Sequence, residues 1–331
     1  MVNPPPLLQV SNLRVKFATQ HGVITPVRGV SLTLNYHETL GIIGESGCGK
    51  SVTAQALMGL LSPRTSRTEG DVSLAGQRLD TLSAAARRQR SGRNMAMIFQ
   101  DPLSSLNPVL TIGFQIEESL KLHTALTRAQ RREKILHLLE QVGIADPLHC
   151  AKAWPHELSG GMRQRVMIAI AIASAPSMLI ADEPTTALDA TIQAQILQLL
   201  DDIKQQTGMG IIFITHDLSV VARLCQRVVV LYAGQVVEET DVVTLFENPR
   251  HPYTRALLAA RPSRDRAPKS RLEEIRGSVP ALNAPSIGCS FADRCPLATA
   301  RCREQPPALR PLGSHAHQVR CWHAEETGVL V

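Results

Sequence analysis

The sequence predicts an α/β fold in which helices cover a mostly parallel sheet, followed by a C-terminal segment of different character. Short, continuously apolar segments alternate with helical ones, as the buried strands of a parallel sheet alternate with their helices. A Gly-rich loop joins one of these apolar segments to the helix that follows it. After residue 248 the regular pattern fades, and ten of the 21 prolines lie there.

The first 44 residues predict three strands. Residues 7–16 and 27–34 alternate apolar and polar side chains, which is typical of half-buried strands. "TLGIIG" (39–44) is almost continuously apolar and leads into a Gly-rich turn, so it predicts a short buried strand.

Residues 51–100 predict a helix, a polar region and another strand. "SVTAQALMGLL" (51–61) has a helical pattern. Residues 68–92 are polar, and a short helix is expected in "LSAAARRQR". "MAMIFQ" (95–100) predicts the next buried strand.

Residues 101–170 predict a helical subdomain inserted between two strands of the sheet. "TRAQRREKILHLLEQVG" (127–143) is an amphipathic helix that ends at Gly143. "GGMRQRVMIAIAIA" (160–173) is a second, more apolar helix.

The alternation of strands and helices then resumes up to residue 240. "SMLIADE" (177–183) predicts a buried strand that ends in two carboxylates, and residues 191–208 carry an apolar helical stripe. "GIIFITHD" (210–217) is another buried strand. Residues 227–240 predict a hairpin that turns at Ala233-Gly234.

The length and composition predict two domains inside a cell. With 331 residues the chain is long enough for about two domains, which we place at residues 1–248 and 249–331. It has no run of about 18 apolar residues, and its N-terminus lacks the basic and apolar regions of a secretory signal. We therefore expect a reducing cytoplasm, where clustered cysteines bind metals or act in redox chemistry more often than they form disulfides.

The net charge of +6 is concentrated in the C-terminal segment. Residues 249–331 hold 13 of the 35 Lys and Arg residues but 7 of the 29 Asp and Glu residues, so the rest of the chain is neutral. A basic segment can contact nucleic acid or an anionic membrane surface. Because the charges are dispersed and few aromatic residues lie among them, a solvated surface is the favoured interpretation.

"GESGCGKS" (44–51) has the pattern G-x-x-x-x-G-K-[ST] between a predicted strand and a predicted helix. The glycines let backbone N–H groups turn towards phosphate oxygens, and the helix N-terminus adds its positive end. Lys50 would reach the β- and γ-phosphates, and Ser51 would offer its hydroxyl to Mg²⁺. The sequence therefore predicts a nucleoside triphosphate site.

Asp182 and Glu183 end the predicted strand "SMLIADE" (177–183) at the sheet edge where such folds bind ligands. Asp182 is expected to support Mg²⁺, and Glu183 is the candidate base that polarises the attacking water. His216 and Gln100 also follow strands, but by themselves they would be interpreted as structural residues.

"LSGGMRQR" (158–165) places Ser159, Gly160 and Gly161 at the start of a helix and forms a second candidate anion site. The two candidate phosphate sites lie more than 100 residues apart in one chain. Because one nucleotide does not need both from one fold, two chains arranged head to tail would complete each other's sites.

Together these residues resemble the ATP-binding subunits of ABC transporters, over residues 7–240. Six motifs occur in the order of that family: Walker A at 44–51, the Q-loop Gln100, the signature Leu158 to Met162, Walker B from Met178 to Asp182 with Glu183, the D-loop Ala187-Leu188-Asp189, and the switch His216. The resemblance implies a P-loop ABC ATPase core, with a mostly parallel sheet, an antiparallel β subdomain and a helical subdomain.

The resemblance assigns a role to each motif residue. The residues that it implies for ATP binding are Phe17, Gly44, Glu45, Ser46, Gly47, Cys48, Gly49, Lys50, Ser51 and Asp182. The implied Mg²⁺ ligands are Ser51, Gln100 and Asp182. The implied catalytic residues are Glu183, His216 and Gln100. The residues implied to contact the partner's ATP are Ser159, Gly160, Gly161, Met162 and Asp189.

Three of these positions need comment. Phe17 would stack on adenine, and a core Phe in a strand is an equally good interpretation. Cys48 stands where Ser is frequent and Met162 where Gln is usual. At residue 48 the backbone makes the expected contact with phosphate, so the side chain matters little. At residue 162 Met is common in the peptide-importer branch of the family. ATPase activity is therefore still expected.

Three further stretches resemble the oligopeptide/dipeptide/nickel importer branch: "IFQDPLSSLNP" (98–108), "NPRHPYTRALLAA" (248–260) and the late cysteines. This resemblance implies a second, non-identical ATPase subunit, two membrane permease subunits, an extracytoplasmic solute-binding protein and a place on the cytoplasmic face of the membrane. Di- or oligopeptides are the first expectation for the substrate, and nickel or another small solute is the alternative. A soluble ABC ATPase acting on nucleic acid or ribosomes is the rival interpretation.

Cys289, Cys295, Cys302 and Cys321 form the pattern C-x5-C-x6-C-x18-C. Structural zinc sites usually contain close C-x2–4-C pairs, which this pattern lacks. Four widely spaced thiolates suit a [4Fe–4S] cluster, and the resemblance to the importer branch implies such a cluster in this region. Zinc and the absence of any metal are the alternatives. His315, His317 and His323 could replace a thiolate, although ordinary surface histidines are the favoured interpretation.

Overall fold

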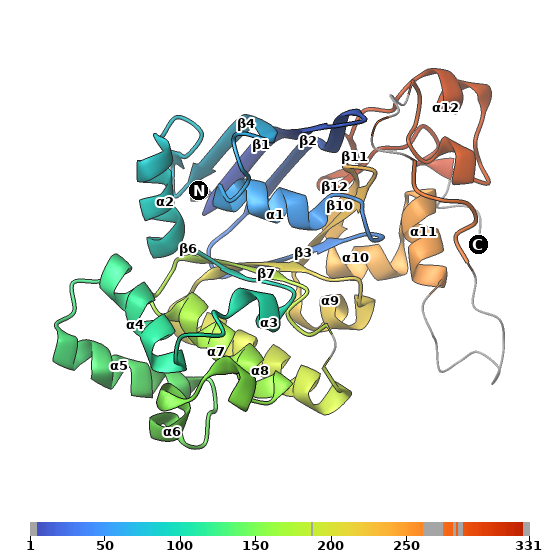
Figure 1. Cartoon of the computed structure of the whole chain (residues 1–331). Helices are drawn as coiled ribbons and strands as arrows, with labels where there is room; N and C mark the ends of the chain where they lie inside the picture. The colour runs from blue at the N-terminus through green and yellow to red at the C-terminus, as the bar shows by residue number, and fades with distance from the viewer. Residues whose placement is uncertain (1–4, 187, 261–273, 281–282, 284–286, 327–331) are drawn as a thin grey trace. The chain divides into compact units, whose positions relative to one another are not determined.

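The computed structural model describes residues 5–186, 188–260, 274–280, 283 and 287–326, and the chain divides into two compact units. The first unit comprises Met1–Leu7, Leu34–Glu38 and Thr81–Phe213. The second unit comprises Leu8–Thr33, Thr39–Asp80 and Ile214–Val331. Figure 1 shows the helices and strands that make up these units.

An antiparallel sheet in the second unit has the strand order β2-β1-β4-β5. Its strands are β2 (Gly22–Leu34), β1 (Leu8–Thr19), β4 (Ser66–Leu74) and β5 (Gln77–Arg78). In β1 alternate side chains are buried, as the sequence predicts. Strand β4 was not predicted, because most of its residues are polar and only Val72 and Leu74 are buried; it is held by its pairing with β1.

A second group of strands in this unit has the order β11-β12-β10-β9-β3. Their bounds are β3 (Thr39–Ile43), β9 (Arg227–Tyr232), β10 (Gln235–Asp241), β11 (Arg310–Leu312) and β12 (Ser314–Val319). Strand β3 pairs with β9 in parallel, and β9 pairs with β10 in an antiparallel hairpin. The predicted turn is confirmed, because Ala233 and Gly234 have φ values of 45° and 77°.

The segment after residue 248 packs against this group of strands. It contributes β12, which pairs with β10, and the helices α11 (Pro252–Ala259) and α12 (Ala300–Glu304) with the 3-10 helix η2 (Ala292–Arg294). The sequence predicts a separate segment, whereas β12 is hydrogen-bonded to the strand group itself. The other helices of the second unit are α1 (Lys50–Met58), α9 (Leu218–Leu224) and α10 (Val242–Glu247).

The strands of the first unit have the order β8-β7-β6. They are β6 (Met95–Ile98), β7 (Met178–Asp182) and β8 (Gly210–Ile214), and every side chain in them is buried. Strands β6 and β7 are parallel, with Ile98 opposite Ala181. The continuous apolar runs in the sequence are thus explained by burial on both faces.

The first unit also contains the predicted helical region. Its helices are α2 (Ala84–Arg93), α3 (Pro102–Ser105), α4 (Ile112–His123), α5 (Arg128–Gln141), α6 (Pro147–Lys152), η1 (Pro155–Glu157), α7 (Gly160–Ile172) and α8 (Ala190–Thr207). A capping box between Thr127 and Gln130 starts α5, one residue after the predicted start. Gly208, with a φ of 71°, ends α8 as predicted. Among the described residues, no helix is both long and apolar enough to cross a bilayer.

Candidate functional site: a phosphate loop and a carboxylate edge

The Gly-rich loop of the second unit connects β3 to α1 and is too tightly packed for other residues at two positions. A Cβ atom on Gly44 would lie 2.3 Å from the carbonyl oxygen of Leu231. A Cβ atom on Gly49 would lie 2.3 Å from the carbonyl oxygen of Pro26. Both glycines have positive φ values, 151° and 102°. Close backbone packing alone therefore requires two of the glycines of the sequence pattern.

The Lys50 side chain is buried and folds back across this loop. Its Nζ donates to the carbonyl oxygens of Gly44, at 2.7 Å, and of Glu45, at 3.1 Å. Cys48 is buried, and burial raises the pKa of its thiol. The carbonyl oxygen of Cys48 accepts from the N–H of Gly234 at 2.9 Å. The hairpin turn thus supports the loop, and the Cys48 side chain faces protein.

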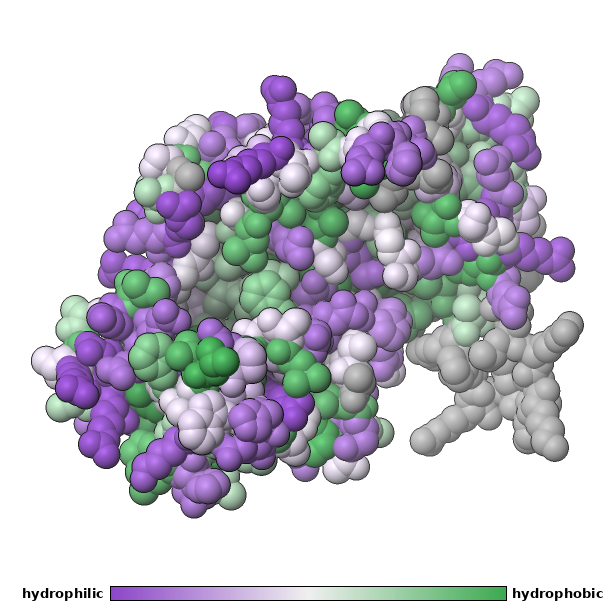
Figure 2. Space-filling model, viewed as in Figure 1, coloured by the Kyte–Doolittle hydropathy of each residue, from purple (hydrophilic) through white to green (hydrophobic). Residues whose placement is uncertain are grey.

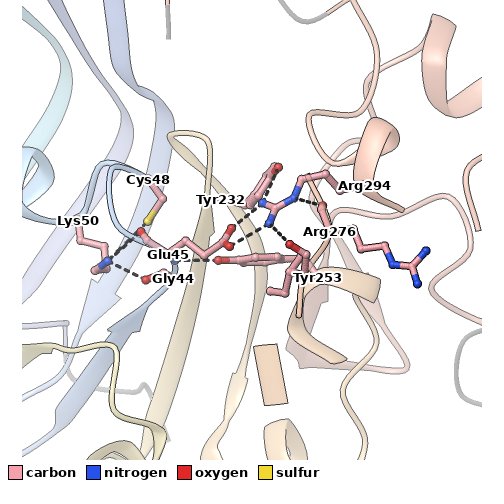
Figure 3. Close-up of polar contacts among 9 residues, drawn as sticks. Gly44, Glu45, Cys48, Lys50, Tyr232, Tyr253, Arg276 and Arg294 are labelled. Carbon is pink, nitrogen blue, oxygen red and sulfur yellow. Dashed lines mark hydrogen bonds and ion pairs between the residues drawn. The ribbon is translucent and has the colours of Figure 1, made fainter. Parts of the chain in front are cut away.

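Glu45 makes contacts that the sequence does not predict. Its backbone N–H donates to the hydroxyl of Tyr253 at 2.8 Å. Its carboxylate accepts two hydrogen bonds from Arg294, and these hydrogen bonds raise the pKa of the guanidinium (Figure 3). Since Glu45 and Arg294 are 249 residues apart in the sequence, no local pattern indicates this pair.

In the first unit, the ends of β6 and β7 bring two predicted residues together. Gln100 and Glu183 each follow the register pair Ile98–Ala181 by two residues, so parallel pairing places them side by side. The Gln100 amide donates to Glu183 Oε2 at 3.2 Å. The hydroxyl of Thr186 donates to the same oxygen at 2.9 Å.

Glu183 and Asp182 differ in their backbone and exposure. Glu183 has a φ of 48°, in the left-handed region that a non-glycine residue rarely adopts and that recurs at functional sites. The Asp182 side chain ends the buried strand and is 4% exposed. The strand end therefore offers one buried carboxylate and one that is held by two donors, as a site for a cation and a water would require.

Two other predicted residues cap helices of the first unit. The Ser159 hydroxyl accepts from the N–H of Met162 at 3.3 Å at the start of α7, while Gly160 is exposed. Asp189 accepts from two N–H groups at the start of α8. Ala187 of the predicted D-loop lies outside the described residues.

The remaining predicted ATP-site residues lie in the second unit. His216 is exposed and follows β8, and Phe17 is partly exposed near the end of β1, opposite Ser66. Ser46 and Gly47 are exposed on the loop, and Ser51 is partly buried in α1. The contact of Phe17 with adenine stays a prediction.

The four late cysteines also lie in the second unit, and their thiols are free and close together. Cys289 N–H donates to the carbonyl oxygen of Cys302 at 2.7 Å. Burial, and then the neighbouring Cys289, Cys295 and Cys302, raise the pKa of Cys321 to about 12. Among the described residues, no group of three or more His, Cys, Asp and Glu side chains is placed to hold a metal ion.

Two histidines near the cysteines have protein partners. His323 Nε2 lies 3.6 Å from the Cys302 sulfur and its Nδ1 contacts Glu326. His317 is buried and bonds Glu238 at 2.9 Å, so it is not a surface histidine as the sequence suggested. The side chain of His315 lies outside the described part of the chain.

Comparison with known proteins gives a family for this arrangement. A family model described as "ABC transporter" matches residues 27–186. A probable peptide ABC transporter ATP-binding protein of Sinorhizobium fredii is 50% identical over 97% of this chain and 96% of its own length. The chain belongs to the ABC transporter ATP-binding family. A second model, "Oligopeptide/dipeptide transporter, C-terminal region", matches residues 237–302.

Other relatives of this ABC ATPase agree with the family and its fold. The dipeptide transport ATP-binding protein DppD of Escherichia coli is 47% identical over 95% of this chain and 96% of its own length. The dimeric bacterial ABC transporter cassette MJ0796 has a TM-score of 0.63 at 29% identity and covers 71% of this chain and 98% of its own. A post-hydrolysis dimer of the same cassette, bound to ADP and phosphate, also has a TM-score of 0.63, at 27% identity and the same coverage. The predicted family and fold class are confirmed.

Proposed function

We propose that this ABC ATPase hydrolyses ATP to power the import of di- and oligopeptides, bound to the cytoplasmic face of the cell membrane. The observation that carries the ATPase part is the Gln100–Glu183 contact at the ends of two in-register strands. A carboxylate held there can polarise the water that attacks the γ-phosphate. The importer part rests on relatives that are described as peptide and dipeptide transport ATP-binding proteins and match nearly the whole chain.

In this proposal the phosphate loop binds the triphosphate of ATP. Lys50 exchanges its contacts with the Gly44 and Glu45 carbonyl oxygens for the β- and γ-phosphates. Ser51, Gln100 and Asp182 supply hard oxygen ligands of the kind that Mg²⁺ prefers, and a bound Mg²⁺ would neutralise phosphate charge.

Glu183 then acts as the base, with its carboxylate oriented by Gln100 and Thr186. The exposed His216 is proposed to contact the γ-phosphate and to report its loss.

A second ATPase subunit would complete each site. The N-terminus of α7, with its Ser159 cap and exposed Gly160, offers backbone N–H groups and a helix dipole to a phosphate of the partner's nucleotide. Gly161, Met162 and Asp189 would line the same contact. Binding of two ATP molecules closes this dimer and hydrolysis reopens it, and we propose that the second subunit is a different chain.

Exposed apolar side chains after Gln100 support a membrane partner. Leu103 of α3 is 61% exposed and Val109 is 76% exposed. Figure 2 shows hydrophobic side chains at the surface where α3 to α6 lie in Figure 1. We propose that two permease subunits cover this surface and that an extracytoplasmic binding protein delivers the solute. Nickel or another small solute is the alternative cargo.

Purification from membranes tests this assignment against a soluble ABC ATPase. The proposal predicts that two permease subunits and a second ATPase subunit co-purify with the chain, and that Leu103→Asp with Val109→Asp removes them. Val23→Asp is the matched control, because Val23 is 59% exposed on β2 in the other unit. Recovery of ribosomes or nucleic acid in place of membrane proteins would contradict the importer role.

The four late thiols are proposed to hold one prosthetic group, a [4Fe–4S] cluster. The Cys289, Cys295 and Cys302 thiols all act on the pKa of the Cys321 thiol, so the four lie near one another. Their wide spacing in the sequence suits a body larger than a single ion. A bound cluster would cross-link this proline-rich segment or respond to redox state. Its negative charge would be offset by nearby arginines such as Arg294 and Arg320.

Metal analysis after anaerobic purification tests the thiol proposal. We expect a brown protein with about four irons per chain, and loss of iron in Cys295→Ser. Cys150→Ser, which changes the buried cysteine of α6, should keep the iron. A colourless protein loaded with zinc would show that the cluster assignment is wrong.

A further inference from the structure

A polar contact joins the C-terminal segment to the phosphate loop, and the chemistry proposed above does not use it. Arg294 Nη1 donates to Glu45 Oε2 at 2.6 Å, and Nη2 donates to Oε1 at 3.0 Å. The hydroxyl of Tyr253 accepts from the backbone N–H of Glu45 at 2.8 Å. Glu45 is the second residue of the loop, so both its side chain and its backbone are held by residues beyond 248 (Figure 3).

The Arg294 guanidinium is fixed by partners other than Glu45. Nε donates to the carbonyl oxygen of Arg276 at 2.9 Å, and Nη2 donates to that of Ile275 at 3.0 Å. Nη1 donates to the Tyr232 hydroxyl at 3.3 Å. All five N–H groups are therefore used, and the side chain is 5% exposed. Its contact with Glu45 is preorganised by the C-terminal segment.

An aromatic cluster fixes the geometry on the other side of this contact. The Tyr232 ring packs against Tyr253, with centroids 4.6 Å apart, and against Phe291 at 5.2 Å. Ile43 of β3 lies opposite Val230 of β9 in the parallel register. Glu45 and Tyr232 follow these two residues by two positions, so they lie next to each other. Loop, strand β9 and C-terminal segment thus meet at one carboxylate.

The turn that carries Arg294 is framed by the cysteine-rich segment. The N–H of Ala292 donates to the carbonyl oxygen of Cys289 at 3.0 Å, and the N–H of Cys295 donates to that of Ala292 at 3.3 Å. Arg294 directly precedes Cys295. These hydrogen bonds connect the turn that carries Arg294, the last residue of η2, to the backbone at Cys289 and Cys295.

We propose that Arg294 and Tyr253 are positioning residues for the nucleotide site, and that ATP affinity depends on the C-terminal segment through them. Arg294 neutralises the Glu45 carboxylate beside the loop, where an unpaired charge would repel phosphates. Tyr253 holds the backbone of Glu45 and so limits the freedom of the loop. This inference rests on the proposed ATP site of the loop.

The test is the dissociation constant for ATP, measured by calorimetry on the full chain with Mg²⁺ chelated to prevent hydrolysis. Arg294→Met should weaken ATP binding about ten-fold, since it leaves a carboxylate without its charged partner. Glu45→Gln leaves the Arg294 guanidinium without its carboxylate partner, but a positive charge beside the loop does not repel phosphates, so this variant should weaken binding less than Arg294→Met. The double variant should return to the affinity of Glu45→Gln.

This rescue separates positioning from a merely structural role. If the double variant binds as weakly as Arg294→Met, then Arg294 acts through folding and the proposal is wrong. Arg303→Met is the matched control, because Arg303 pairs with Asp293 on the exposed surface of the same segment and should not affect ATP binding.

Tyr253→Phe gives a second test if Arg294→Met does not fold. It keeps the buried ring and removes the acceptor for the Glu45 N–H, so we expect roughly three-fold weaker binding. Unchanged affinity would overturn the role of Tyr253. A wild-type chain that fails to bind ATP would overturn the proposed site as well, whereas equal binding by wild type and the Arg294 variant would overturn this inference alone.

Discussion

At the scale of single residues, Glu183 combines a strained backbone with a carboxylate that has two assigned donors. Its φ of 48° carries a cost of roughly 1–2 kcal/mol for an L-residue. The donors, Gln100 and Thr186, both donate hydrogen bonds to Oε2, and these two bonds fix the orientation of the carboxylate. We interpret the strain as the consequence of placing the proposed base directly after the last residue of β7.

Glu183→Gln should bind ATP and lose hydrolysis, because the amide keeps the shape of the carboxylate but cannot take a proton. We expect kcat to fall at least about 10²-fold, as is typical when a general base is removed. The measurement is phosphate release by the assembled complex. Glu140→Gln, an exposed change on α5, is the control. A wild-type rate in Glu183→Gln would show that another residue is the base.

At the scale of elements, the hairpin turn between β9 and β10 is also a support for the phosphate loop. Gly234 has a φ of 77°, and a Cβ there would lie 2.5 Å from the carbonyl oxygen of Pro26. Its N–H donates to the carbonyl oxygen of Cys48. A turn that the sequence indicates simply as a hairpin therefore has a second role in the loop.

Gly234→Ala should cost more unfolding free energy than Gly76→Ala. Both glycines have similar positive φ values, 77° and 78°, but nothing lies within 4 Å of a Cβ on Gly76. The shared backbone term is roughly 1–2 kcal/mol, and the clash with Pro26 adds to it in Gly234→Ala alone. Urea unfolding of the two variants measures the difference. Equal losses of unfolding free energy in the two variants would mean that the turn moves away from Pro26 at no cost.

Helix α11 supplies a pH-dependent element. Burial lowers the pKa of His251 to about 4, although nearby Glu238 opposes this shift. The neutral ring is required, because Nδ1 accepts from the N–H of Tyr253 at 3.0 Å and caps the helix. The unfolded chain therefore binds a proton between pH 6.5 and 4 that the folded chain does not, and stability falls as pH drops through this range.

From this one histidine we expect a loss of about 2 kcal/mol between pH 7.5 and pH 5. Urea unfolding at the two pH values checks it. His251→Asn, which can still cap α11, should show a smaller loss over the same range. An equal loss in both proteins would place the titration on other groups.

The sequence predicts the elements that have a clear local pattern of apolar residues, and it does not predict those that depend on contacts with distant parts of the chain. The strands that deliver Gln100, Asp182 and Glu183 are apolar throughout, so their ends could be placed from the sequence. Strand β4 and helix α4 were missed, because β4 is mostly polar and α4 follows a stretch without a clear period. The Glu45–Arg294 contact joins residues that only the tertiary fold brings together.

At the scale of the whole molecule, the C-terminal segment is integrated with the second unit through β12, the aromatic cluster and Arg294. This integration gives a physical reason for a peptide-importer C-terminal region on an ABC ATPase. The segment belongs to the surroundings of the phosphate loop, in addition to any group that its four thiols hold. The similarity to peptide transport subunits extends over nearly the whole chain, which agrees with a C-terminal segment that works together with the ATPase core.

Peptide uptake by whole cells tests the central claim most directly. Cells that lack this chain should lose energy-dependent uptake of labelled di- or oligopeptides. The wild-type chain should restore uptake, whereas Glu183→Gln, expressed at the same level, should not. Normal peptide uptake without the chain, or full restoration by Glu183→Gln, would contradict its role as the ATP-hydrolysing subunit of a peptide importer.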